Sequence, residues 1–259
     1  MRKFSIFIPT KDRPNVLLKY MKKNYDKRCH WIIGLEKQDE KKYDLFFNIF
    51  PKIEKIVYEN NQGIGYARKM GAIHSYLRND IISFQMDDNV NIKGDWFDFY
   101  DKMMSIKSLY FCGGYKSIYD LFYKMNLFPD NALVKEHNIP AICFGFKTEV
   151  IKKINFDEKL KYHYSEDDDF GMMLECLCGI NSVYIYKGFK FDKKRFENGG
   201  GRSVESLEGF KKTVKYLNEK YGFEIFKIMK NGKIRKSLVK FMKNFEEIKK
   251  NLIQKGFIK

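Results

Sequence analysis

Two groups of acidic side chains stand out in the sequence, and the first follows a run of apolar residues. The run 81–86 has the character of a buried parallel strand and ends in Asp87, Asp88 and Asn89. Ligands gather beyond the carboxyl ends of the strands in an open α/β sheet. Adjacent carboxylates repel each other unless a cation or a proton lies between them. A divalent metal ion holding a phosphate would satisfy both conditions; the alternative is that the acidic pair only terminates a strand.

The second group runs from Ser165 to Asp169 and precedes the apolar segment 170–174. Serine is a favoured N-cap residue, so Ser165 can cap a helix that begins here. Acidic side chains in the first turn also interact favourably with the helix dipole. We therefore expect this group at the N-terminus of a helix, where it either takes part in chemistry or forms a solvated cap.

Two glycine-containing segments could approach a ligand closely. Gly63 and Gly65 precede a stretch with helical periodicity, whose first N–H groups would be open to an anion. The segment 198–203 contains three consecutive glycines and Arg202, which is too many glycines for a regular element. That segment is either a mobile lid over a phosphate or an ordinary connection.

The elements that must position these groups alternate between strand and helix. This alternation over the first 90 residues predicts an α/β fold, with a mainly parallel sheet, right-handed crossovers and flanking helices. The segment 120–137 has the character of an insertion. The predicted strands are 4–8, 30–35, 55–58, 81–86, 110–115, 141–146 and 183–186.

Length and composition place the chain among folded globular proteins. Its 259 residues suffice for one large domain, or one domain with an appendage, and 44% hydrophobic and 17% aromatic residues exclude a disordered chain. No apolar run reaches the roughly 18–20 residues of a membrane span, and the first apolar run is too short for a signal peptide. We expect a cytoplasmic protein without a stable membrane anchor. The five cysteines are odd in number and lack zinc-site spacing, which indicates reduced core residues.

Positive charge is concentrated at the C-terminal end. The net charge is +16, and residues 206–259 hold fifteen Lys or Arg and five Glu, so they contribute +10. Apolar residues at helical spacing predict two amphipathic helices here, separated by Asn231-Gly232, that pack on the domain and expose lysines. This charge suggests a polyanionic partner, nucleic acid or an anionic membrane. The competing explanation is a composition biased toward lysine by an AT-rich genome.

Four segments, in order along the chain, resemble motifs of nucleotide-sugar glycosyltransferases with the GT-A fold, most closely the family 2 type. The resemblance covers residues 4–175 and implies a GT-A catalytic domain over 1–205, with a nucleotide-binding half (1–90) and an acceptor half (91–205). Residues 206–259 would form a lysine-rich helical extension packed on it. The segments are Ile-Phe-Ile-Pro-Thr-Lys-Asp-Arg (6–13), Asn-Gln-Gly-Ile-Gly-Tyr-Ala-Arg (61–68), Met-Asp-Asp-Asn (86–89) and Glu-Asp-Asp-Asp-Phe (166–170).

The resemblance implies a role for each residue that matches the motifs. Asp88 and Asn89 would face Mn²⁺ or Mg²⁺ and the diphosphate, although the family often has a third acid where this chain has Asn89. Asp167 would be the base that activates the acceptor hydroxyl for direct displacement with inversion, with Glu166 and Asp169 as alternatives. The residues implied in nucleotide-sugar binding are Pro9, Thr10, Asp12, Arg13, Glu36, Gly63, Arg68, Asp87 and Arg202.

A narrower resemblance concerns the acceptor. The second acidic motif, the 198–203 loop and the lysine-rich end are similar to phage-type glycosyltransferases that decorate hydroxymethylated DNA bases, the group associated with TET/JBP hydroxylases. This implies a hexosyl- or pentosyltransferase that uses a UDP-sugar and a DNA acceptor, in the host cytoplasm if the protein is phage-encoded. Two alternatives stay open: the same chemistry on a glycan, lipid or protein, and a non-catalytic nucleic-acid-binding module. The sequence leaves the sugar, the nucleotide and the oligomeric state open.

Overall fold

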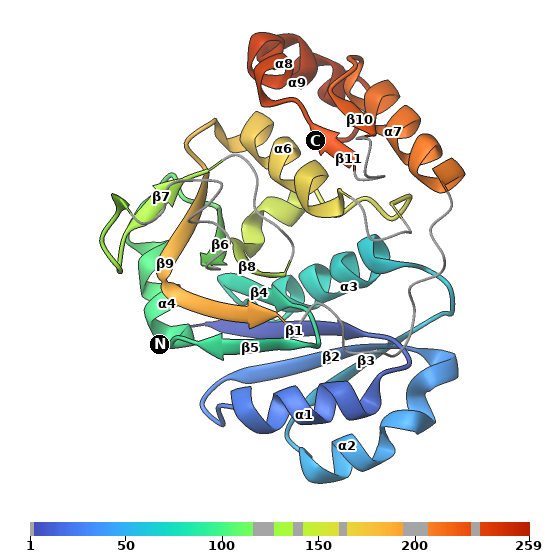
Figure 1. Cartoon of the computed structure of the whole chain (residues 1–259), viewed down its shortest axis with the longest axis vertical. Coiled ribbons are helices and arrows are strands. Elements are labelled where there is room, and N and C mark those ends of the chain that lie inside the picture. Colours follow the sequence, from blue (N-terminus) through green and yellow to red (C-terminus); the bar gives the residue numbers. More distant parts are fainter. Residues whose placement is uncertain (1–2, 116–126, 137–141, 161–164, 194–206, 229–233) are drawn as a thin grey trace.

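The computed structural model describes residues 3–115, 127–136, 142–160, 165–193, 207–228 and 234–259. A nine-stranded sheet runs through the molecule in the order β3-β2-β1-β4-β8-β6-β9-β5, and β7 pairs with β9 off this path. Helices flank the sheet (Figure 1). The predicted α/β fold, a sheet with helices on its faces, is confirmed.

The first half of the sheet is parallel throughout. All seven residues of its first strand are buried, as expected for a central parallel strand that reads as a continuous apolar run. Because the strands are parallel, their carboxyl ends meet at one edge. The strands are β1 (Phe4–Thr10), β2 (His30–Glu36), β3 (Glu54–Tyr58) and β4 (Ile82–Met86), and the connecting elements are α1 (Pro14–Asn24), the 3₁₀ helix η1 (Lys37–Tyr43), α2 (Asp44–Ile49) and α3 (Ile64–Leu77).

The second half of the sheet mixes both strand directions. Its elements are β5 (Val90–Lys93), α4 (Trp96–Met104), β6 (Phe111–Tyr115), β7 (Leu133–Lys135), β8 (Cys143–Lys147), the 3₁₀ helix η3 (Thr148–Lys152), α6 (Glu166–Cys178) and β9 (Val183–Lys193). Strand β8 runs antiparallel to β4 and β6, whereas β6 and β9 are parallel. Strand β5 pairs with β9 at the far end, yet the Asn24 side chain bonds both the Val90 carbonyl and the Ile92 N–H. The sheet therefore curls back toward α1.

Aromatic packing fixes the two halves to each other. The ring of Phe84 on β4 lies 4.9 Å from that of Phe99 on α4, centroid to centroid. Gly145 on the adjacent β8 leaves the space for it, since a Cβ there would lie 2.6 Å from the Phe84 ring. On α6, Phe170 stacks on Phe156 at 4.1 Å. The Phe170 ring also contacts Phe111 on β6 at 5.6 Å and Phe146 on β8 at 5.3 Å, and these contacts hold the helix that carries the second acidic group against the sheet.

The C-terminal segment consists of α7 (Leu207–Tyr221), β10 (Phe226–Ile228), β11 (Ile234–Lys236), α8 (Leu238–Lys243) and α9 (Phe245–Gln254). It lies beside α6, at the end of the molecule away from α1 and α2 (Figure 1). The prediction of only two helices was incomplete, because an antiparallel strand pair precedes α8 and the second predicted helix is divided at Asn244. Asn231 and Gly232 lie outside the described residues. The predicted helical stripe is buried at Leu217, Tyr221, Phe241 and Ile248.

The sequence predicted reduced cysteines in the core, and all five cysteines lie among the described residues. All five cysteines are free; Cys112, Cys143 and Cys176 are buried, and Cys29 and Cys178 are half-buried. Across the described ranges, no helix combines the length and the apolar character needed to cross a membrane.

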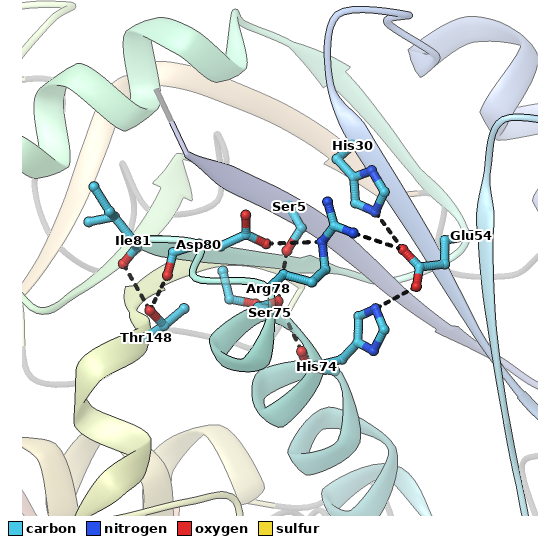
Figure 2. Close-up of polar contacts among 11 residues, drawn as sticks. Ser5, His30, Glu54, His74, Ser75, Arg78, Asp80, Ile81 and Thr148 are labelled. Carbon is cyan, nitrogen blue, oxygen red and sulfur yellow. Dashed lines mark hydrogen bonds and ion pairs between the residues drawn. The ribbon is translucent and has the colours of Figure 1, made fainter. Parts of the chain in front are cut away.

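A polar network occupies the amino ends of the parallel strands, opposite the acidic motif (Figure 2). The Glu54 carboxylate lies 2.7 Å from both His30 Nε2 and His74 Nε2, and Arg78 Nη1 donates to it at 3.3 Å. Burial raises the pKa of Glu54, but its contacts with His30, His74 and Arg78 outweigh that effect and its pKa lies below the ordinary value. This network ties α3 to β2 and β3 away from the candidate site.

Candidate functional site

The candidate site lies where the carboxyl ends of β1, β2 and β4 meet the start of α3. Thr10 ends β1, Glu36 ends β2, and Asp87 follows directly after β4. Strand β4 stops at Met86, as the sequence predicted, and β5 begins at Val90. The acidic motif is therefore the turn between two strands.

Asp88 is the centre of the first acidic group. Its carboxylate is fully buried, with Oδ1 2.5 Å from Arg13 Nη2 and Oδ2 accepting from Thr10 Oγ1 at 2.7 Å. Tyr43 supports this arrangement, since its hydroxyl lies 2.9 Å from Thr10 Oγ1 and accepts from the Arg13 backbone N–H. Burial raises the pKa of Tyr43 to about 12, so the phenol stays protonated at neutral pH. The loop after β1 is thus bonded to Asp88 through Thr10 and Arg13, and to η1 through Tyr43.

Arg68 connects the first acidic group to the second. It is 1% exposed on α3, and its Nη2 donates to Asp87 Oδ1 at 3.1 Å. Its Nε lies 3.5 Å from Glu166 Oε1, and the guanidinium stacks over the Phe144 ring at 5.1 Å. A buried cation between two carboxylates offsets their repulsion and their loss of hydration. Gln85 also accepts from Arg68, at 3.4 Å.

Two more of the residues predicted to bind the nucleotide-sugar are Asp12, in the loop after β1, and Glu36, at the end of β2. Glu36 is 3% exposed and pairs with Lys11 at 2.9 Å. Asp12 has a φ of 52° and pairs with Lys42 Nζ, which also binds Asp39 at 2.8 Å. Asp39 also accepts from the Asp12 N–H at 3.1 Å, which ties the loop after β1 to η1.

The two glycines at the start of α3 have different structural roles. Gly63 has a φ of 85°, a backbone conformation that favours glycine, and it is the residue from which α3 begins. A Cβ on Gly65 would overlap the carbonyl oxygen of Asp157. The close approach predicted at Gly65 is therefore made by the turn at residues 157–160 of the chain itself.

The second acidic group opens α6 at Glu166, as predicted. The expectation that the Ser165 side chain caps this helix was wrong: Ser165 has a φ of 66°, and its hydroxyl makes no capping hydrogen bond to the described chain. N-cap residues normally have extended backbone, which points the side chain at the helix N–H groups. Asp167 is half-buried, and Asp168 lies 3.6 Å from Lys236 Nζ.

Asp169 is fully buried, and its two carboxylate oxygens contact α7. Oδ2 lies 2.8 Å from Lys220 Nζ, and the Tyr221 hydroxyl donates to Oδ1 at 2.8 Å. Burial raises the pKa of Asp169, an effect that the Lys220 ammonium opposes. This carboxylate therefore holds α6 and α7 together.

The structure brings most of the sequence-predicted residues to one edge. Pro9, Thr10, Arg13, Asp88 and Asn89 belong to the β1–β4 edge, and Arg68 joins Asp87 to Glu166. Arg202 and the 198–203 loop lie outside the described residues.

Sequence reasoning missed Asp39, Tyr43, Lys220 and Lys236. Tyr43 and Asp39 carry no motif of their own. Lys220 had a usable signal: it falls three residues after Leu217 and beside Tyr221, on the apolar stripe of α7.

Comparisons with known proteins identify the fold. No protein-family model matches the sequence, and no curated protein is significantly similar to it. The structure of GalNAc-T7 with UDP, GalNAc and Mn²⁺ is similar with a TM-score of 0.60, at 13% identity over 83% of this chain and 48% of the other. S. aureus TarS 1-349 with UDP-GlcNAc has a TM-score of 0.56, at 13% identity over 83% and 66%. Glucosyl-3-phosphoglycerate synthase from Mycobacterium tuberculosis, with Mn²⁺ and UDP-glucose, has a TM-score of 0.54, at 8% identity over 91% and 86%.

The chain therefore has the GT-A fold of nucleotide-sugar glycosyltransferases. It spans about half the length of the GalNAc-T7 chain. The resemblance seen in the four sequence motifs is confirmed at the level of the fold.

Proposed function

We propose that this protein is a glycosyltransferase that moves a sugar from a nucleotide-sugar to an acceptor hydroxyl. The observation that carries the proposal is Arg68, a buried guanidinium that contacts Asp87 of one acidic group and Glu166 of the other. The motif expected at the donor and the motif expected at the acceptor therefore adjoin each other at the carboxyl edge of the sheet. GalNAc-T7 and TarS, which share the fold, hold UDP and UDP-GlcNAc.

The donor would lie along the loops after β1, β2 and β4. Arg13 is 23% exposed beside Asp88 and can turn its guanidinium to a diphosphate oxygen, for which its fork geometry is suited. Glu36, with Lys11 and Gln38 bonded to its carboxylate, is suited to a ribose or base hydrogen bond. Gly63 and the first N–H groups of α3 complete the anion-binding edge.

The protein's own oxygen ligands suit a divalent cation only when the diphosphate of the nucleotide-sugar supplies further ligands. Asp88 and Asn89 offer oxygen ligands, but among the described residues no three His, Cys, Asp or Glu side chains converge as a metal site. Mg²⁺ is commonly held by one or two carboxylates together with substrate phosphates and water. When bound, such a cation would offset the negative charge that builds on the leaving diphosphate.

Asp167 is the proposed base. It lies in the first turn of α6 and is half-buried, whereas Glu166 contacts Arg68 and Asp169 is fully buried against α7. Asp167 would take the proton of the acceptor hydroxyl while the oxygen of that hydroxyl bonds to the anomeric carbon of the sugar. The bond from that carbon to the diphosphate oxygen breaks in the same step, and the configuration inverts.

The acceptor we propose first is a hydroxymethylated DNA base, on the sequence resemblance and the +10 charge of residues 206–259. One observation favours a lipid-borne acceptor instead. Val239 is 79% exposed on α8, with Leu238 and Met242 also exposed beside Lys240 and Lys243. Aliphatic side chains among lysines suit an anionic membrane surface better than a phosphate backbone.

The test offers the protein UDP-sugars and Mn²⁺ with three acceptors: hydroxymethylcytosine duplex DNA, soluble glycans, and anionic vesicles carrying a lipid alcohol. Mass spectrometry then locates the transferred sugar. Sugar on the nucleobase supports the DNA acceptor, and sugar on glycan or lipid alone eliminates it. Absence of transfer and of donor hydrolysis with every nucleotide-sugar tried would refute the proposed activity.

A further inference from the structure

Lys220 on α7 is buried where the sequence predicted an exposed lysine surface. Its side chain is 0% exposed, and Nζ lies 2.8 Å from Asp169 Oδ2 and 2.9 Å from Asp157 Oδ2. Lysines are almost never fully buried without a charged partner. Here one ammonium serves two carboxylates that belong to different parts of the chain.

The two carboxylates are fixed by further bonds from α7. The Tyr221 hydroxyl donates to Asp169, and the Tyr216 hydroxyl donates to Asp157 at 2.5 Å. Burial raises the pKa of Asp157, but Lys220 and Tyr216 outweigh it, so its pKa lies below the ordinary value. Three side chains of α7 thus close around two acids, and Lys220 lies between them.

Each of these acids adjoins one half of the candidate site. Asp169 lies in the same helical turn as Glu166 and Asp167, at the start of α6. The carbonyl oxygen of Asp157 lies so close to Gly65, in the first turn of α3, that a Cβ there would overlap it. Helix α3 carries Arg68, which contacts both acidic groups. The contacts run from the start of α3 through Asp157, Lys220 and Asp169 to the start of α6.

We propose that Lys220 is a positioning residue that ties the acidic turn of α6 to the start of α3, and so sets the base relative to the donor. The proposal rests on the proposed glycosyl transfer. It makes the C-terminal segment part of the catalytic unit, in contrast to an appendage that only recruits the acceptor. Lys236 on β11 lies 3.6 Å from Asp168 in the same turn and would likewise hold the start of α6 against the C-terminal segment.

The test compares Lys220→Met and Lys220→Arg in the full-length protein, with Lys215→Met as the matched control. Lys215 is on the same helix, its side chain is 79% exposed, and it pairs only loosely with Glu219 at 3.8 Å. Because small misplacements of a catalytic group can cost on the order of 100-fold in rate, we expect that loss of kcat in Lys220→Met. Donor affinity, by calorimetry, should stay within about threefold, and Lys220→Arg should recover part of the rate because it restores the cation.

Amide hydrogen exchange gives a readout that does not depend on activity. Exchange over residues 166–170 should rise in Lys220→Met and stay unchanged in Lys215→Met, while β1 to β4 remain protected. If Lys220→Met does not fold, Asp169→Asn/Lys220→Met removes the two charges whose side chains are 0% exposed and leaves Asp157, which keeps its bond from the Tyr216 hydroxyl. This double variant is expected to fold, since removing both partners of a buried pair costs far less than removing one. That double variant should still show raised exchange and low kcat.

The outcomes separate the two proposals. Wild-type kcat together with wild-type exchange at 166–170 in Lys220→Met, or in the double variant where the single one fails to fold, would overturn the positioning role. If the wild-type protein transfers no sugar at all, glycosyl transfer fails, and exchange alone decides whether Lys220 fixes the α6 turn.

Discussion

Removing the Arg68 cation should destabilise the protein far more than removing a surface arginine. Arg68→Met removes the guanidinium that contacts both Asp87 and Glu166, whose side chains are only 21% and 7% exposed. Breaking one partner out of a buried ion pair costs about 3–5 kcal/mol. At roughly 2–4 °C per kcal/mol for a chain of this size, the melting temperature should fall by about 6–20 °C.

The assay is thermal unfolding at pH 7.5, with Arg78→Met as the matched control. Arg78 also bonds a carboxylate, Glu54, but is 37% exposed at the opposite edge of the sheet (Figure 2). Exposed pairs are worth about 0.2–1 kcal/mol, so the control should shift by no more than a few degrees. Arg68→Met/Glu166→Gln should recover part of the loss, because it removes one of the two carboxylates. Equal shifts in Arg68→Met and Arg78→Met would refute the view that Arg68 compensates the two acidic groups.

Three further predictions concern the base, the metal and pH. Asp167→Asn should abolish transfer while calorimetry shows donor affinity nearly unchanged; normal transfer would mean that another residue is the base. Chelation with EDTA should stop turnover and Mn²⁺ should restore it, and Asp88→Asn should weaken Mn²⁺ binding measured by electron paramagnetic resonance in the presence of UDP; Mn²⁺ binding unaffected by the substitution would exclude Asp88 as a ligand. The pKa of Glu54 lies below its ordinary value of 4.5, so its pairing with His30, His74 and Arg78 stabilises the fold above that pH, and this stabilisation is lost as pH falls through the folded-state pKa. Glu54→Gln should therefore lower the melting temperature at pH 7, and this difference should shrink as the pH falls below 4.5; a difference that stays constant as the pH is lowered would contradict the assignment.

The parallel half of the sheet could be predicted because its information is local. Strands β1, β2 and β4 are mostly apolar, α1 has an apolar stripe, and α3 is preceded by a glycine. The direction of β8 could not be predicted, since antiparallel pairing with β4 is a non-local choice that the apolar run 141–146 does not encode. Strands β10 and β11, three residues each, are too short and too rich in lysine to show alternation.

The candidate site could likewise be predicted where its pattern is local, and not where it depends on packing. Acidic groups at a strand end and a helix start were visible as patterns, and so was the glycine before α3. Their mutual contact through Arg68 was not visible, because it depends on how α6 packs onto the sheet through Phe170. Asp169 and Asp167 look equivalent in the sequence, and only the packing of α7 distinguishes the buried carboxylate from the half-buried one.

Sugar transfer activated by Asp167 is tested by following both products of one reaction. The wild-type protein and Asp167→Asn are incubated with each UDP-sugar, Mn²⁺ and the acceptor panel, and released nucleoside diphosphate and sugar-modified acceptor are quantified together. The account predicts equal amounts of the two products from the wild-type protein with at least one donor, and neither above background from Asp167→Asn. Nucleotide release without any modified acceptor, or equal product from both proteins, would contradict it.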